Sequence, residues 1–180
     1  MKDALINRRE FLRNLGVIGA GALLSMSPWL SVFSEVVETS SEKCHLAIIG
    51  TGSKGHFLMS FSLQNPKVEI VALCDIYQPS MEKALNLVRE AKVYTDYRKV
   101  LENKTVDAVL VATPLNLHCQ IVLDAFDAGK HVFCEKSIGF TMEECFRIYK
   151  KHISTGKVFF TGQQRLFDPR YIKAIEMIHA

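Results

Sequence analysis

From residue 44 onward, short apolar runs of strand length alternate with segments of helical periodicity. The apolar runs cover residues 45–49, 68–73, 106–112, 131–134 and 158–161. They are continuously apolar rather than alternating with polar residues, which is typical of parallel strands covered by helices on both faces. Because strand–helix–strand crossovers are right-handed, we predict an α/β fold with a doubly wound parallel sheet of the Rossmann type.

The segments between these runs carry helix signals. Residues 53–63 and 79–91 place apolar side chains at helical spacing. Thr141 and Glu144 match a capping box in front of another helix, and Gly156 suits its C-terminal end. This last helix is expected to bury one apolar stripe, made of Met142, Cys145, Phe146, Tyr149 and Ile153.

The first 42 residues differ in character from the rest of the chain. Arg8 and Arg9 precede Phe11 and Leu12, and an uncharged, mainly apolar stretch follows over residues 14–30. This pattern predicts a twin-arginine signal, and with it the twin-arginine export machinery as a partner and a periplasmic location. An ordinary signal peptide or membrane anchor that contains two arginines is the alternative.

These patterns divide the chain into three parts. Residues 1–42 are interpreted as the signal segment and a linker, residues 43–165 as the Rossmann domain, and residues 166–180 as the start of a second domain. Residues 169–180 have a helical pattern without a C-terminal cap. We therefore expect the chain to be truncated within this second part.

Composition narrows the class of protein. The 180 residues are 48% hydrophobic and 23% charged, with a net charge of +3, which is typical of a globular domain and gives no reason to expect a nucleic-acid partner. The five cysteines are odd in number and widely spaced, so buried free thiols are a better interpretation than a disulfide framework. No cysteine pair has metal-ligand spacing, and we predict no metal site.

A glycine-rich turn is the clearest functional signal. The sequence Gly50-Thr51-Gly52-Ser53-Lys54-Gly55 directly follows the first apolar run and opens a helix, within a βαβ unit of about thirty residues. In this motif the first glycine permits a tight turn, the second lets the backbone approach a pyrophosphate, and the third lets helix and strand pack closely. The helix N-terminus then attracts phosphate. We predict that all six residues contact a dinucleotide, a plain strand-to-helix turn being the alternative.

Asp75 stands at the end of the second apolar run, twenty-five positions after Gly50. A carboxylate at this place can accept both ribose hydroxyls of an adenosine and would repel a 2′-phosphate. Ile76, Tyr77 and Gln78 follow it, so no adjacent cation offsets that repulsion. The sequence therefore favours NAD over NADP, while a helix-capping role for Asp75 is compatible with the same position.

Further polar residues follow the ends of three later strands, where open α/β sheets bind their ligands. The predicted cofactor-binding residues there are Thr113, Pro114, Asn116, His118, Glu135, Lys136, Gln164 and Arg165.

Taken together, these motifs resemble the N-terminal part of the Gfo/Idh/MocA oxidoreductases, the family of glucose-fructose oxidoreductase and inositol dehydrogenase. The resemblance covers residues 44–180 and rests on the glycine motif, the stretch from Ala112 to His118, Glu135-Lys136 and the region from Arg165 to Pro169. The family usually has Glu-Lys-Pro where this chain has Ser137 as the third residue.

The resemblance implies specific roles for three residues. Lys136 would be catalytic, lying beside the nicotinamide and binding the substrate oxygen that gains or loses hydride. His118, at the start of a helix, would either contact the ribose or form a local hydrogen bond. Arg165 would either orient the cofactor, or reach an acidic substrate group, or form a structural salt bridge.

Three functions are compatible with this resemblance. The first is an NAD-dependent oxidoreductase acting on a small carbohydrate-like substrate, a sugar or polyol-type hydroxyl. The second is an NAD-dependent glycosidase with a redox-elimination mechanism, as in related N-acetylgalactosaminidases, and Lys136 favours the first over it. The third is a non-catalytic NAD-binding fragment, because in this family the substrate pocket comes from a following α+β substrate domain, and the resemblance implies that this chain is truncated before it. Association into a homo-oligomer is left open.

Overall fold

The computed structural model of the chain describes residues 43–163 and 168–179, so the predictions for residues 1–42, Gln164 and Arg165 lie outside the described residues. One compact unit spans Lys43–Gly162. The second unit contributes Gln163, Asp168 and the helix α8 (Pro169–His179) to the described residues. The predicted domain boundary at residue 165 falls in the part that is not described.

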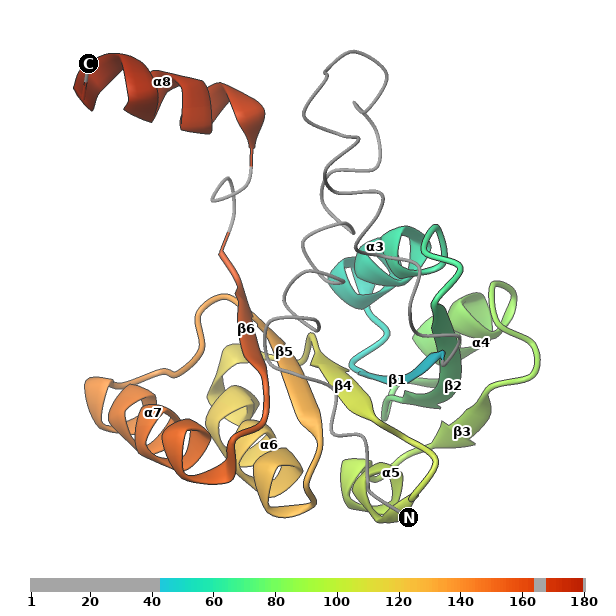
Figure 1. Ribbon diagram of the computed structural model, residues 1–180. Helices are drawn as coiled ribbons and strands as arrows, with labels where there is room; N and C mark the ends of the chain where they lie inside the picture. The colour runs from blue at the N-terminus through green and yellow to red at the C-terminus, as the bar shows by residue number, and fades with distance from the viewer. Residues whose placement is uncertain (1–42, 164–167, 180) are drawn as a thin grey trace, which may run out of the picture. The chain divides into compact units, whose positions relative to one another are not determined.

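The larger unit is built on one six-stranded sheet (Figure 1). Its strands lie in the order β3-β2-β1-β4-β5-β6, and every neighbouring pair is parallel. This arrangement confirms the predicted doubly wound parallel sheet. The strands are β1 (Cys44–Ile49), β2 (Val68–Cys74), β3 (Lys92–Tyr94), β4 (Ala108–Val111), β5 (His131–Glu135) and β6 (Phe159–Gly162).

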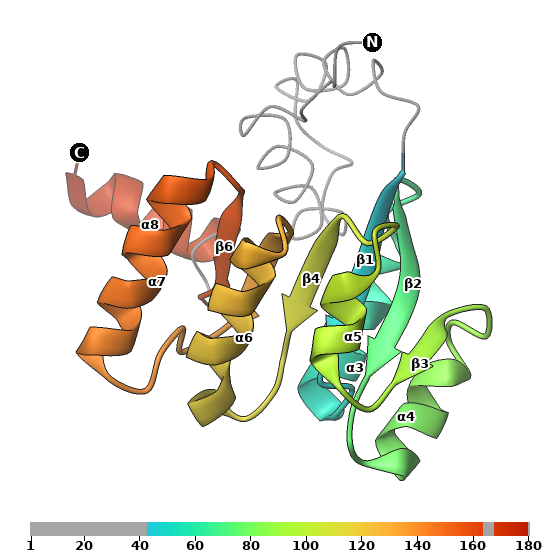
Figure 2. The ribbon, with the colours of Figure 1, turned by 90° about the horizontal axis from the view of Figure 1, so that it is seen from below.

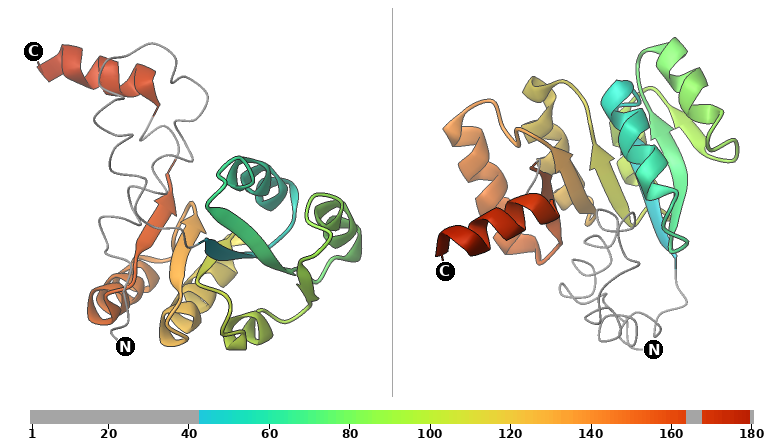
Figure 3. Two further views of the ribbon diagram at one scale, coloured as in Figure 1. Left: turned by 45° about the vertical axis from the view of Figure 1, so that its right-hand side comes forward. Right: turned by 90° about the horizontal axis from the view of Figure 1, so that it is seen from above.

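Helices cover the two faces of the sheet in two groups. The chain moves outward from β1 first toward β3 and then toward β6, and right-handed crossovers in opposite directions place their helices on opposite faces. Accordingly, α3 (Ser53–Ser62) and α4 (Gln78–Leu85) lie on one face. The other face carries α5 (Tyr97–Glu102), α6 (Leu115–Asp127) and α7 (Met142–Thr155), as Figure 2 and Figure 3 show.

The core between the sheet and α6 explains why the central strands are continuously apolar. All four residues of β4 are buried, and Val109 and Val111 pack in one cluster with Val122 and Phe126 of α6. A strand that is buried on both faces has no position for a polar side chain. The apolar run 106–112 is therefore a direct consequence of the central place of β4.

The predicted helix after residue 141 is present, but the face expected to be buried is wrong. Thr141 and Glu144 form the capping box, and Gly156 ends α7 with φ of 65°. The buried residue of α7 is Ile148, whereas Phe146 is 54% exposed. The prediction is wrong because α7 packs on α6 and on the edge of the sheet through the face that carries Ile148, which lies beside the predicted stripe. The other exposed members of the predicted stripe are Met142, Tyr149 and Ile153.

The cysteine prediction is confirmed. Cys74, Cys119 and Cys134 are buried, Cys44 and Cys145 are half-buried, and all five are free thiols. Burial raises the pKa of the Cys134 thiol to about 12, so this group stays a neutral, unreactive part of the core.

The described residues contain neither a metal-binding cluster nor a membrane-spanning helix. Across residues 43–163 and 168–179, no three His, Cys, Asp or Glu side chains gather in a way that could hold a metal ion. None of the helices in that same part of the chain is both long and apolar enough to cross a bilayer.

The helix α8 begins at Pro169, as predicted, and the Asp168 side chain accepts a hydrogen bond from the Arg170 backbone N–H at 3.0 Å. Its apolar residues Ile172 and Ile175 are 43% and 54% exposed, and none of its residues is buried.

Candidate functional site

The residues predicted to form the site follow strands that end at one edge of the sheet. Ile49 at the end of β1 is in register with Cys74 on one side and with Val111 on the other. Val111 in turn is in register with Cys134 of β5. The residues that follow these positions therefore meet at the same edge. Between β1 and β4 the strand order reverses, and such switch points are where open α/β sheets bind ligands.

Two of the three glycines in the turn after β1 are required by the protein's own packing. Gly50 has φ of 93°, and a Cβ there would lie 2.6 Å from the carbonyl group of Ala112. A Cβ on Gly55 would lie 1.9 Å from the carbonyl oxygen of Gly50. Both contacts are with backbone, which cannot move aside. These glycines thus hold the turn against β4 and the start of α3, as the motif predicts.

Gly52 has no such requirement, and this is the observation that points to a ligand. A Cβ on Gly52 would meet no atom of the described residues within 4 Å, and its φ of −58° is accessible to any residue. Packing and backbone geometry therefore leave the glycine unexplained, whereas a ligand lying against the backbone explains it. Gly52 is the N-cap of α3, where no described side chain caps the helix and no acidic residue stands in the first turn. Backbone N–H groups at such a terminus attract an anion.

Ser53 and Lys54 complete the first turn of α3 around this open space. Ser53 is exposed, and Lys54 is 40% exposed with its Nζ 3.3 Å from Oε1 of Glu135. The Lys54 ammonium also lies over the ring of Phe57, 5.1 Å from its centroid. Lys54 therefore brings a positive charge to the N-terminal end of α3 and links that end to β5.

Asp75 binds the glycine turn directly. Its Oδ2 accepts hydrogen bonds from the backbone N–H of Thr51 at 2.7 Å and from the Thr51 hydroxyl at 3.0 Å. Its Oδ1 accepts a third from the Tyr77 N–H at 2.9 Å. A carboxylate has about four acceptor positions, so capacity for a further hydroxyl remains. Asp75 thus fixes the glycine turn, a role that was not predicted from the sequence, and its binding of a ribose stays a prediction.

Glu135 forms a second link beneath the edge of the sheet. Its side chain is only 8% exposed and contacts Lys54 through one oxygen, while the other accepts a hydrogen bond from the Lys136 N–H at 3.1 Å. Gly162 of β6 makes room for this carboxylate, since a Cβ there would lie 2.7 Å from its Oε1. The backbone of Lys136 is therefore held from one side, and its side chain is exposed at the edge where the glycine turn lies.

The loop between β4 and α6 contributes the remaining described candidates. Pro114 is the N-cap of α6, and Pro114 and Asn116 are both exposed. Thr113 carries a buried hydroxyl with no hydrogen-bond partner within the described part of the chain. A buried polar atom without a partner is costly, and a dinucleotide in the crevice could supply the missing partner. His118 forms local hydrogen bonds, which is the second of its two predicted roles.

The geometry thus brings the predicted site residues on four strand ends to one edge, and Gln164 and Arg165 lie outside the described residues. Two participants were not predicted from the sequence. Gly162 was missed because its need for a glycine depends on Glu135 of the neighbouring strand. Ser137 was missed because its backbone carbonyl oxygen is the atom that contacts the site, 2.6 Å from Nδ1 of His118, and no side-chain pattern reveals such a contact.

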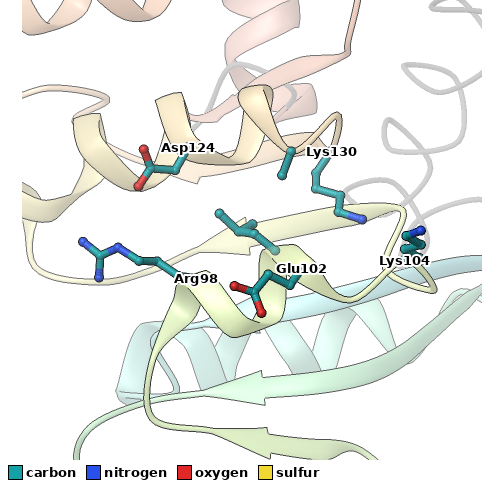
Figure 4. Close-up of a pocket in the computed structure, with 7 residues that line it drawn as sticks. Arg98, Glu102, Lys104, Asp124 and Lys130 are labelled. Carbon is teal, nitrogen blue, oxygen red and sulfur yellow. The ribbon is translucent and has the colours of Figure 1, made fainter.

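A cavity of about 470 Å³ lies elsewhere, between α5 and α6 and near the amino ends of β4 and β5 (Figure 4). Its lining includes Arg98, Glu102, Asp124 and Lys130. The buried Lys130 ammonium donates hydrogen bonds to the carbonyl oxygens of Asn103 and Val106 at 2.9 and 2.8 Å. Burial lowers the pKa of this lysine. Lys130 thus links the loop before β5 to the loop before β4. None of the predicted site residues that the structure describes lines this cavity.

Comparison with known proteins gives results that agree with this geometry. Over 96% of its length the chain is 29% identical to a glycosyl hydrolase family 109 protein of Stenotrophomonas maltophilia, and the match covers 39% of that protein. Over 62% of its length it is 33% identical to an inositol 2-dehydrogenase of Salmonella paratyphi B, of which it covers 34%. The crystal structure of an NAD-binding protein from Listeria innocua matches 77% of the chain with a TM-score of 0.69 and 32% identity, and 40% of that protein is covered.

The chain therefore spans between 34% and 40% of the length of these proteins. The model of the Gfo/Idh/MocA group, described as an oxidoreductase family with an NAD-binding Rossmann fold, matches residues 44–163. This description confirms NAD as the predicted cofactor. The residues at the carboxyl edge of the sheet fit it through the open space at Gly52 and the Thr113 hydroxyl, which lacks a hydrogen-bond partner within the described residues. Since the match covers more than half of the chain, this protein belongs to the Gfo/Idh/MocA oxidoreductase family.

Proposed function

We propose that this protein is the NAD-binding part of an oxidoreductase that transfers hydride to or from a sugar or polyol-type hydroxyl. The observation that carries the proposal is the exposed side chain of Lys136 at the same sheet edge as the open N-terminus of α3. A cationic hydrogen-bond donor for the alkoxide and a phosphate-binding helix end are two parts that a nicotinamide-dependent alcohol oxidation needs from this half of the site. The similarity to an inositol 2-dehydrogenase supports a polyol as the substrate class.

NAD supplies the hydride chemistry when it is bound. The glycine turn and the first turn of α3 would hold its pyrophosphate, and Asp75 would bind the adenosine ribose. The Lys136 ammonium would donate a hydrogen bond to the substrate oxygen, which stabilises the negative charge that develops there as the hydroxyl proton leaves. Glu135 supports this role because its carboxylate holds the Lys136 backbone N–H in place.

A direct test combines NAD titration with an assay for NADH. The 180-residue chain should bind NAD, and we expect it to turn over no substrate alone, because its relatives are more than twice as long. Efficient NADH formation by this chain with a panel of inositols and sugars would contradict that expectation. Reading the coding sequence beyond Ala180 tests whether a substrate domain follows. In a protein that includes such a domain, Lys136→Met should abolish NADH formation even at NAD concentrations that saturate the variant.

A redox-elimination glycosidase is the second candidate, supported by the similarity to a family 109 glycosyl hydrolase over 96% of the chain. The two candidates differ in their net use of the cofactor. A glycosidase of this kind would release sugar without net NADH formation, and removal of NAD would stop it. An oxidoreductase would form NADH in proportion to the product. Measuring both products in one assay separates them.

We further propose export through the twin-arginine route to the periplasm. The paired arginines Arg8 and Arg9 support it, and the match to the family 109 protein is long enough to include part of the first 42 residues. Replacement of both arginines by lysine should retain the protein in the cytoplasm. Unchanged export of that variant would point instead to an ordinary signal peptide.

A further inference from the structure

One face of α7 presents large apolar side chains to solvent. The helix lies at the end of its layer, packs on α6 and buries Ile148 (Figure 2). On another side of the same helix, four large apolar residues are each between 54% and 69% exposed. This outer face of α7 consists of Met142, Phe146, Tyr149 and Ile153. Apolar residues exposed singly are common on a protein surface, whereas a contiguous apolar patch marks an interaction site.

The spacing of these four residues suits contact with another helix. They are separated by four, three and four positions. This is the 3.5-residue repeat by which two helices pack along each other. Because residues three and four apart are neighbours on a helix surface, the four side chains form one continuous apolar line about three turns long. The outer face of α7 is therefore suited to a partner helix.

The charged residues that border the outer face indicate that the partner helix is a second copy of α7. Glu143 lies in the first turn and Lys150 seven positions later, and both are exposed on the same border of the face. When two copies run antiparallel, the acidic end of each lies beside the basic part of the other, and Glu143 meets Lys150 of the partner subunit. A twofold axis makes this pair occur twice. A parallel pair would instead place equal charges at the same end.

The exposed area is also of the size that a dimer requires. Large side chains bury about 150–250 Å² each, so the exposed fractions on the outer face correspond to roughly 500 Å² per copy. Two copies together would bury about 1,000 Å², which is the lower end of the range for specific interfaces. We therefore expect a dimer that dissociates on dilution.

We propose that the outer face of α7 is the interface of a homodimer in which two α7 helices pack antiparallel about a twofold axis. At the centre, Phe146 of each copy packs against Tyr149 of the partner subunit. Met142 packs against Ile153 of the partner subunit at both ends. None of these residues belongs to the predicted cofactor site, so the proposal stands independently of NAD binding.

Sedimentation equilibrium of the full 180-residue chain tests the interface. The wild type should show a monomer–dimer equilibrium. Phe146→Gln should raise the dimer dissociation constant roughly thirtyfold, because the lost contact enters the interface twice. Ile175→Gln on α8 is the matched control, since Ile175 and Phe146 are both 54% exposed, and it should associate as the wild type does. A wild type that is monomeric at every concentration, or a Phe146→Gln variant that dimerises equally well, would overturn the proposal.

A charge exchange distinguishes a second copy from any other partner. Glu143→Lys and Lys150→Glu each place equal charges opposite one another twice, so each variant alone should dimerise more weakly than the wild type at low salt. Mixed in equal amounts, the two variants should form a heterodimer as readily as the wild type forms its homodimer, because opposite charges meet again. Both positions are exposed, so both variants should stay folded, which circular dichroism checks. If the mixture associates no better than the separate variants, the antiparallel pairing of α7 is wrong.

Discussion

Replacement by alanine should have opposite consequences for stability at two glycines of the turn after β1, Gly52 and Gly55. Replacing Gly52 by alanine adds a methyl group that meets no atom within 4 Å in the part of the chain that the structure describes, at a backbone φ of −58° that alanine adopts freely. The variant should therefore be as stable as the wild type or more stable by up to about 1 kcal/mol, because alanine restricts the unfolded chain. Its NAD affinity should fall, because the methyl group occupies the space that the pyrophosphate needs.

The size of this loss follows from the hydrogen bonds at the helix end. A hydrogen bond to a charged group contributes about 1.5–3 kcal/mol, and keeping the pyrophosphate away from the Gly52 backbone would lose at least one. That corresponds to an NAD affinity at least about tenfold lower. Urea unfolding measures the stability, and calorimetric titration measures the affinity.

Gly55→Ala is the matched comparison. Its Cβ would lie 1.9 Å from the Gly50 carbonyl oxygen, so the turn must move and we expect a loss of stability of about 3 kcal/mol or more. A stable Gly52→Ala that binds NAD with wild-type affinity would refute the assignment of Gly52 to the ligand. A destabilised Gly52→Ala would show that the glycine serves packing after all.

Three other predictions follow from the same structure. Asp75→Ala should weaken NAD binding by about 1–3 kcal/mol in calorimetry. The comparison variant Thr51→Val removes only the hydroxyl bond to Asp75, so it separates support of the turn from ribose binding. An unchanged NAD affinity of Asp75→Ala would leave Asp75 a structural role. Ile148→Ala should lower the unfolding free energy by about 2–5 kcal/mol. Met142→Ala, at a residue that is 69% exposed, should change it by less than about 0.5 kcal/mol. Equal losses of stability would contradict the burial of the Ile148 face of α7. Burial lowers the pKa of His131 to about 4, below the ordinary value of about 6.5 in the unfolded chain. The contribution of His131 to stability is therefore complete above about pH 6.5 and is lost as the pH falls toward 4. Unfolding titrations of His131→Gln should show a weaker loss of stability over that range.

Local signals predicted much of the fold. The run ending at Ile49 and the glycines after it specified the first strand, the turn and the start of α3, because each depends on neighbours close in the chain. The capping box of Thr141 and Glu144 was predicted for the same reason. The strand β3 has three residues and α5 has six, and such short elements leave no periodic pattern to read.

Features that depend on distant residues could not be predicted in this way. Which side of α7 is buried is decided by how it packs on α6 and the sheet edge, so the apolar stripe in the sequence indicated the wrong face. The bond from His118 to Ser137 joins residues nineteen positions apart through a backbone atom. Gly162 is required only because the Glu135 carboxylate occupies the space beside it. In each case the missing information is the packing between elements.

The central claim is that the carboxyl edge of this sheet binds NAD through the glycine turn and Asp75. The most direct measurement is a calorimetric titration of the chain with NAD and, separately, with NADP. We predict saturable binding of one NAD per chain and weaker binding of NADP, because the Asp75 carboxylate would repel its additional phosphate. Absence of NAD binding, or tighter binding of NADP, would contradict this account.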